Sequence, residues 1–303
     1  MTFRDDKPRL SIIICVYNMR REAPRTILSA LPPYQKNVNG SEYEVIVVDN
    51  GSTQPLEASS LETLPGTVRY VQYPGRSPSP VFALNWAAQQ VARGSHIAFC
   101  IDGTRILSDG LVAAWLKHFD IGSQVFVYTL GWHIGPNMHQ FASQTGYNQD
   151  AEDRLLESVD WRHHPEALFE ISTLAGSSQA GFFAAIAESN AFAASRALLD
   201  KLGLYDERFT SPGGGLANLE IFSRYVTSED VHPICLLGEG SFHQYHDGIA
   251  TSGKVQWETL AKEYETIIKK PYEVPTYTTL YSGPFRREAH KFYAESLQKA
   301  LHR

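Results

Sequence analysis

Two aspartates stand directly after apolar, strand-like runs, where a carboxylate can meet a ligand. Asp49 opens the segment Asp49–Ser52, and Asp102 is followed by Gly103. Each is an ordinary turn residue when taken alone, because Asp-Asn-Gly-Ser and Asp-Gly are common turn sequences. Ligands of open parallel sheets bind beyond the carboxyl ends of the strands. Two acids at one such edge therefore favour a shared site, in which a cation held by Asp102 would neutralise phosphate groups.

Two common phosphate-binding loops are absent. The first strand-like run is followed by Tyr17 and Asn18 instead of Gly-x-Gly-x-x-Gly, which disfavours a dinucleotide-binding oxidoreductase. The Gly253-Lys254 pair is followed by Val255, so it does not form a Walker-type loop. Any bound nucleotide must have its phosphates neutralised in another way.

The elements that position these residues alternate between strands and helices through the first half of the chain. Continuous apolar runs of this kind are typical of a parallel sheet that is covered on both faces. Repeated strand–helix–strand units predict a right-handed, doubly wound α/β layer with a mostly parallel, Rossmann-like sheet. The predicted strands are Leu10–Tyr17, Tyr43–Val48, Val68–Tyr73, His96–Ile101 and Gln124–Leu130, and the predicted helices are Ala23–Leu31, Leu56–Leu64, Pro80–Arg93 and Asp109–Phe119.

The second half of the chain is less regular. No apolar period is sustained between Gly131 and Ala187, and the only element expected there is a helix at Ala151–Trp161. Further on we expect helices at Arg196–Leu202, Leu216–Tyr225, Lys254–Lys270 and Arg286–Leu301, a strand at His232–Leu237, and a polar turn region at Gly238–Gly248. The expected organisation is a nucleotide-binding half (1–130), a second half of the same domain (131–250) and a C-terminal helical extension (251–303).

Composition excludes several classes of protein. The chain has 303 residues, 43% of them apolar, so it can bury a substantial core without disulfides or metals. A net charge of -6 argues against nucleic-acid binding, which needs dense lysine and arginine. Two long uncharged stretches, Ile121–Gln149 and Ile171–Ala187, are interrupted by polar residues, and neither is expected to span a bilayer. Three cysteines suggest buried thiols in a reducing compartment, and hence a cytoplasmic protein.

The histidines near residue 240 form a second group with chemical potential. His243 and His246 lie in the acid-flanked segment Gly238–Asp247, where they can bind a metal or simply hydrogen-bond the backbone. His243 follows an apolar residue and is the better candidate of the two. His133 and His139 fall in the irregular middle of the chain, and no pattern gives them a role.

An ordered series of segments resembles glycosyltransferase family 2 over roughly residues 9–250. The segments are Ser11–Asn18 (SIIICVYN), Val47–Thr53 (VVDNGST), Gly75-Arg76, Ala83–Asn85, Ile101-Asp102 and Leu202–Phe209 (LGLYDERF). The resemblance implies a GT-A fold, a nucleotide-sugar donor (a UDP-sugar at the level of the family) and Mg²⁺ or Mn²⁺ as cofactor. It implies that Asp49 bonds the base edge and that Asp102 is the first acid of an Asp-x-Asp motif. The donor-binding set so implied is Tyr17, Asn18, Asp49, Arg76, Asn85 and Asp102.

The chain departs from the family pattern at the metal motif. Thr104 stands where the second acid belongs, and one carboxylate is a weak Mg²⁺ site. Enzymes with this fold often add a late histidine to the metal, so His243 or His246 would compensate. The expected metal ligands are therefore Asp102, His243 and His246.

A second departure affects the catalytic base. The family's general base is an aspartate, and the matching position here is Asn218, which cannot accept a proton usefully. Glu220 is the nearest carboxylate and the first candidate base, although it points away from Asn218 on a helix. Glu188, which ends a long uncharged run, is the second candidate.

The resemblance implies an inverting, metal-assisted glycosyltransferase that acts in polysaccharide or glycoconjugate biosynthesis. Its acceptor would be a hydroxyl group of unknown identity. The alternatives are a non-catalytic nucleotide-sugar-binding module, a nucleotidyltransferase, and a carbohydrate-binding protein that uses aromatic side chains. The amphipathic C-terminal helices are expected to pack on the core, and a homodimer through them is a further possibility.

Overall fold

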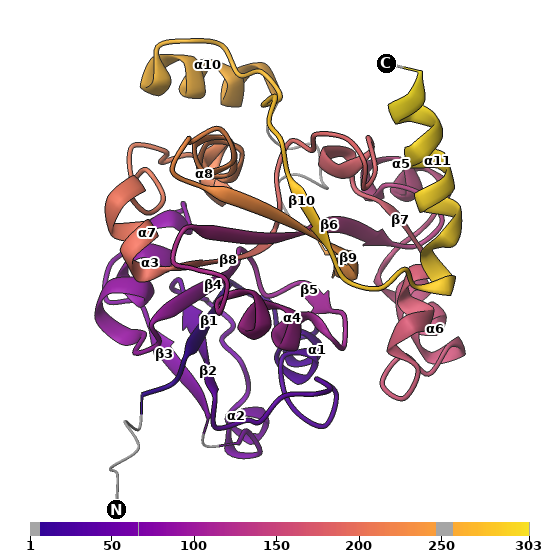
Figure 1. Cartoon of the computed structure of the whole chain (residues 1–303). Coiled ribbons are helices and arrows are strands. Elements are labelled where there is room, and N and C mark those ends of the chain that lie inside the picture. The colour runs from indigo at the N-terminus through magenta and orange to yellow at the C-terminus, as the bar shows by residue number, and fades with distance from the viewer. Residues whose placement is uncertain (1–6, 66, 247–256, 303) are drawn as a thin grey trace, which may run out of the picture.

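The structure is a computed structural model that describes residues 7–302 except residue 66 and residues 247–256, and it has one central sheet flanked by helices (Figure 1). The main strand order is β10-β9-β6-β8-β4-β1-β2-β3. Strand β8 is antiparallel to both of its neighbours, whereas β4-β1-β2-β3 and β6-β9-β10 pair in parallel. The predicted mostly parallel α/β sheet is confirmed.

The strands are β1 (Leu10–Val16), β2 (Tyr43–Asp49), β3 (Val68–Gln72), β4 (His96–Cys100), β5 (Arg105–Leu107), β6 (Val125–Ile134), β7 (Ser172–Leu174), β8 (Ala191–Ser195), β9 (His232–His243) and β10 (Leu280–Ser282). The α-helices are α1 (Ala23–Ser29), α2 (Ala58–Glu62), α3 (Val81–Trp86), α4 (Leu111–His118), α5 (His139–Ala142), α6 (Gln149–Ser158), α7 (Arg196–Leu202), α8 (Ala217–Val226), α10 (Trp257–Ile268) and α11 (His290–Leu301). A π-helical turn at Ala87–Val91 continues α3.

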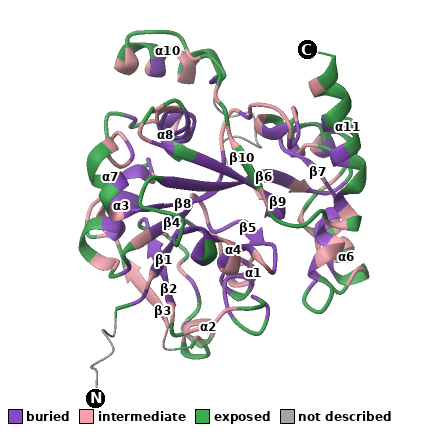
Figure 2. Cartoon of the chain, in the orientation of Figure 1, coloured by how far each residue is buried: buried purple, intermediate pink, exposed green. Residues whose placement is uncertain are grey.

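Side chains that alternate along β1 bury two cores, one on each face of the sheet. Ile12 and Ile14 pack with α1, α2 and α4, whereas Ile13 and Cys15 pack with α3, α7 and α8. Figure 2 shows the central strands as buried. This two-sided burial explains why the β1 and β2 segments are apolar throughout instead of alternating.

The polar turn region predicted at Gly238–Gly248 is wrong for Gly238–His243, which is strand, and its residues 247 and 248 lie outside the described part of the chain. Strand β9 continues to His243, because β6 and β5 supply backbone partners on its two sides. Gly238 has a φ of +71°, and the β6–β9 register shifts near it, where the partner of β6 changes from Cys235 to Gly240. Glycine tolerates this left-handed backbone, so turn-like composition here marks a bulge within a strand.

Several elements of the second half were not predicted. The region from residue 131 to 187 contains the end of β6, helix α5 and strand β7, and β8 follows it. The sequence of β8, Ala-Phe-Ala-Ala-Ser, has no β-branched residue and so gives little strand signal. Its pairing with β4 and β6 places it in the sheet.

The C-terminal segment carries the two expected helices and one unexpected strand. Helices α10 and α11 match the predicted ones within the described residues, and β10 extends the sheet edge in parallel with β9. Among the described residues, no helix combines the length and the apolar composition that a membrane span requires.

Candidate active site

The carboxyl ends of β1, β2 and β4 meet at one edge of the sheet. In the parallel register Val16 lies opposite Asp49, and Ile14 lies opposite Cys100. Asp49 is therefore beside the end of β1, and Asp102 lies two residues beyond the end of β4. The structure brings both carboxylates to the edge where ligands of α/β sheets bind.

Asn18 joins the loop after β1 to the loop after β2. Its side-chain oxygen accepts hydrogen bonds from Gln54 N at 2.9 Å and Thr53 Oγ1 at 3.2 Å, and its backbone N–H donates to Ser52 Oγ at 2.9 Å. Its φ of +54° is a conformation that asparagine tolerates better than most residues. Tyr17 is 51% exposed, so its ring is accessible to a ligand at this edge.

The Asp49 carboxylate is buried at the same edge of the sheet, where β2 ends beside β1. One oxygen accepts the Ser52 N–H at 2.7 Å, and the other accepts the Tyr70 hydroxyl. Burial and the Asp49 carboxylate raise the pKa of Tyr70, which stays a hydrogen-bond donor. Each carboxylate oxygen has a second lone pair, so Asp49 keeps the capacity to accept N–H groups from a base.

Arg76 and Asn85, both assigned to donor binding by resemblance, differ in environment. Arg76 is exposed and makes no hydrogen bond or ion pair with another described residue. Asn85, on α3, is 4% exposed and its amide is already used: it donates to Tyr205 O at 2.8 Å and accepts from Tyr205 N at 3.1 Å. A third bond joins Asn85 to Glu207 Oε1 at 3.1 Å. Asn85 thus holds the loop before α8.

Replacing Asn85 with alanine is expected to destabilise the fold without changing nucleotide affinity. The substitution leaves the buried backbone groups of Tyr205 unpaired, which costs about 1–3 kcal/mol per group. Chemical denaturation and calorimetric titration with a nucleoside diphosphate measure the two effects separately. A lower affinity in the folded Asn85→Ala protein would instead support direct donor binding.

Asp102 is bonded to its own loop. Its Oδ1 accepts the Thr104 N–H at 3.0 Å and the Thr104 hydroxyl, and its Oδ2 lies 3.2 Å from a guanidinium nitrogen of Arg105. Burial opposes ionisation, but Arg105, His246 and Thr104 outweigh it and hold the pKa of Asp102 below its ordinary value. The missing second acid is therefore replaced by a hydroxyl donor and a neighbouring cation.

The two candidate bases occupy contrasting positions. Glu220 forms a two-point ion pair with Arg224 on α8, at 2.8 and 2.9 Å, and is 8% exposed. Glu188 lies just before β8, where its Oε2 accepts the side-chain N–H of Asn218 at 2.6 Å. The carbonyl of Asn190 accepts the Ile101 N–H at 3.3 Å, so this segment borders the Asp102 loop. Asn218 occupies the position that the resemblance assigns to the base, and its side chain holds the Glu188 carboxylate next to that position.

The histidines collect at the end of β9. Nε2 of His243 lies 3.1 Å from Nε2 of His246, as the grouping of these two in the sequence suggests. His133 and His139 also lie here, and both contact the His243 ring. Sequence reasoning gave neither of them a role. The missing signal was the pairing of β6 with the far half of β9, which places His133 opposite His243.

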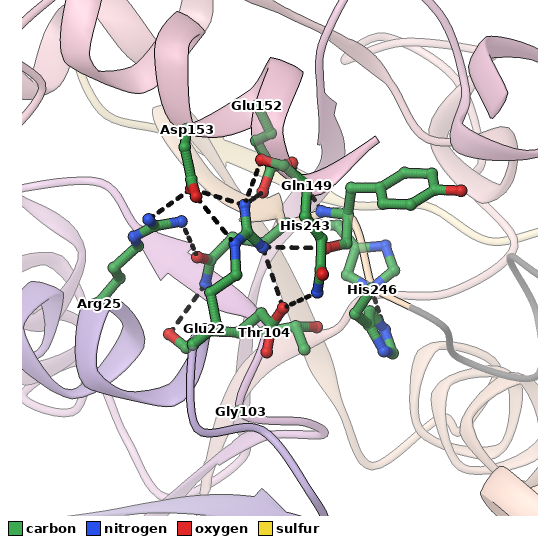
Figure 3. A network of polar contacts seen from close by, with 12 residues as sticks. Glu22, Arg25, Gly103, Thr104, Gln149, Glu152, Asp153, His243 and His246 are labelled. Carbon is green, nitrogen blue, oxygen red and sulfur yellow. Dashed lines mark hydrogen bonds and ion pairs between the residues drawn. The ribbon is translucent and has the colours of Figure 1, made fainter. Parts of the chain in front are cut away.

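An ion network lies beside His243 and His246 (Figure 3). Arg21 bonds Glu152 at 3.0 Å and Asp153 at 2.7 Å on α6, and it donates to the Tyr245 carbonyl at 3.1 Å. Glu152 accepts the Tyr245 N–H at 2.6 Å, and burial raises its pKa to about 7 despite the opposing charge of Arg21. Arg25 on α1 also bonds Asp153, at 2.6 Å, and Gln244, at 3.3 Å, so the network ties α1 and α6 to the segment that follows His243.

The glycosyl transferase family 2 model matches residues 11–169, more than half of the chain. The chain belongs to glycosyl transferase family 2. No curated protein matches it in sequence.

Solved structures similar to this family 2 chain share its fold at low identity. TarS 1-349 of S. aureus in complex with UDP-GlcNAc has a TM-score of 0.52 and 15% identity over 97% of this chain and 73% of that one. GalNAc-T7 with UDP, GalNAc and Mn²⁺ has a TM-score of 0.51 and 16% identity over 79% and 44% of the two chains. A longer TarS structure has a TM-score of 0.51 and 12% identity over 86% and 43%. This chain spans less than half the length of GalNAc-T7 and of the longer TarS.

The expected metal ligand Asp102 fits a divalent cation poorly in this member of the family. Its carboxylate already accepts two bonds from Thr104, and the Arg105 guanidinium lies where a cation would be repelled. The buried imidazoles of His139 and His243 are different, since each has a ring nitrogen without a hydrogen-bond partner among the described residues. A metal therefore fits the histidines better than it fits Asp102.

Proposed function

We propose that this family 2 protein transfers a sugar from a UDP-sugar to an acceptor hydroxyl with inversion at the anomeric carbon. The observation that carries the proposal is the meeting of Asp49, Asp102 and Glu188 at one edge of the sheet. The proposal includes a role in cytoplasmic polysaccharide or glycoconjugate biosynthesis.

The donor would lie across the ends of β1, β2 and β4. Asp49 accepts an N–H of the base, Tyr17 and Asn18 border the nucleoside, and the exposed Arg76 approaches its phosphates. The diphosphate then extends toward Asp102 and Arg105. Arg105 is 7% exposed, and a positive charge in such a water-poor place stabilises a departing diphosphate more strongly than it would in water.

Glu188 is the base in this proposal. It accepts the proton of the acceptor hydroxyl while the acceptor oxygen bonds the anomeric carbon and the sugar's bond to the diphosphate breaks. The bond from Asn218 at 2.6 Å orients the carboxylate and leaves its other oxygen for the acceptor. A divalent cation, when bound, supplies further positive charge for the leaving diphosphate.

The experiment is a donor panel with product analysis. Purified protein is incubated with nucleoside-diphosphate sugars, with and without added divalent metal, and release of free nucleoside diphosphate is measured. We expect one UDP-sugar to be consumed faster than the others, and the same nucleotide to raise the unfolding temperature. Stabilisation without any turnover would favour the second candidate, a nucleotide-sugar-binding module, which Asn218 and Thr104 support because each replaces a family acid.

A further inference from the structure

Three histidines from different elements converge beside the Asp102 loop. His133 on β6 and His243 on β9 are register partners, and His139 begins α5. Their ring centroids are 4.3 Å apart for His133–His139 and 5.2 Å apart for each of the other two pairs. One ring nitrogen from each residue lies within 4.8 Å of the other two, which is close enough for a single ion to reach all three.

Two of these rings have a ring nitrogen without a hydrogen-bond partner among the described residues. Nδ1 of His139 and Nδ1 of His243 are buried and have no hydrogen-bond partner in the described part of the chain. His139 is 0% exposed and His243 is 5% exposed, so water does not readily satisfy either atom. A buried polar atom without a partner destabilises the folded protein, and a metal ion bound to that atom would remove this cost.

The outer nitrogens of the same rings are held as in metal sites. Nε2 of His139 donates to the Ile134 carbonyl at 3.0 Å, which leaves the lone pair on Nδ1. Nε2 of His243 lies 3.1 Å from Nε2 of His246, and a metal on Nδ1 of His243 requires the His243 proton to sit on Nε2 and be donated to His246. His133 differs, because its Nδ1 accepts a hydrogen bond from the backbone N–H of His139 at 2.9 Å. Ligation by His133 gives up that bond, so this residue is the weakest of the three ligands.

We propose that His133, His139 and His243 bind one transition-metal dication of the Zn²⁺ type and that Asp102 is not a ligand. Neutral nitrogen donors suit Zn²⁺, whereas Mg²⁺ prefers oxygen ligands, and the Asp102 carboxylate is already paired with Arg105. Three protein ligands leave a fourth position open in a tetrahedral site. This fourth position can be taken by an oxygen of the donor's diphosphate. Only that contact rests on the proposed function.

Metal binding is measured on the whole chain without nucleotide. Protein stripped with a chelator is titrated with Zn²⁺ and with Mg²⁺ by calorimetry, and with Co²⁺ by its visible spectrum. We expect about one Zn²⁺ per chain, a tetrahedral Co²⁺ spectrum, and no saturable Mg²⁺ binding. Loss of an outer-shell partner of a metal ligand typically lowers metal affinity by about 10–100-fold. His139→Asn and His243→Asn should each lower Zn²⁺ affinity by more than this. His133→Asn should lower it less than either of them.

Two control variants make the assignment specific. His163→Asn removes a histidine whose side chain is 78% exposed, and Asp102→Asn removes the carboxylate, so both should retain wild-type Zn²⁺ affinity. Affinity that falls with Asp102→Asn, or that is unchanged in a folded His139→Asn protein, overturns the proposal. Equal binding of Mg²⁺ and Zn²⁺ by the wild type, or no bound ion, also overturns it and needs no variant. None of these measurements depends on sugar transfer. A negative result therefore rejects the metal site without rejecting the proposed activity.

Discussion

Glu188→Gln is expected to lower the turnover number of sugar transfer by about 10²–10⁴-fold, the usual contribution of a general base. Glutamine keeps the size of the side chain and can still accept the Asn218 N–H at its oxygen, but it cannot take the acceptor's proton. Affinity for the nucleotide should be nearly unchanged, because Glu188 is placed on the acceptor side. Initial rates at saturating donor, together with nucleotide titrations, measure the two quantities.

Glu220→Gln is the matched control. Glu220 is bonded to Arg224 at both oxygens, so its loss should lower thermal stability and reduce turnover far less than loss of Glu188. A folded Glu188→Gln protein with normal turnover, beside an inactive but folded Glu220→Gln protein, would return the role of base to Glu220.

The second large effect is expected at Asp49. Asp49→Ala should weaken binding of a nucleoside diphosphate by about 10–100-fold, since a hydrogen bond to a charged group contributes about 1.5–3 kcal/mol. Calorimetric titration of the folded variant gives this change directly.

Tyr70→Phe separates recognition from stability. It removes the hydroxyl bonded to Asp49 and keeps the carboxylate, so it shares part of the structural disturbance but should bind nucleotide nearly as well as the wild type. If Tyr70→Phe and Asp49→Ala weaken binding equally, Asp49 acts by holding its loop and does not contact the base.

The sheet edge with its two acids could be predicted because local signals determine it. The apolar runs of β1, β2 and β4 end at residues 16, 49 and 100, and parallel pairing places those ends together. The roles of Asp49 and Asp102 were then suggested by the motifs around them. Both inferences need only short stretches of sequence.

The histidine site could not be predicted, because it depends on pairing between distant segments. His133 and His243 are 110 positions apart and meet only through the register of β6 and β9. The continuation of β9 past Gly238 was hidden by turn-like composition. The contact of Asn85 with Tyr205 also joins distant segments and is likewise unmarked in the sequence.

The most direct test of the central claim is a crystal structure of the protein with UDP and Zn²⁺. The account predicts the base against Asp49, the diphosphate beside Asp102 and Arg105, and the ion on the histidines of β6, α5 and β9. A nucleotide bound away from the ends of β1, β2 and β4 would contradict it, as would no bound nucleotide at saturating concentration.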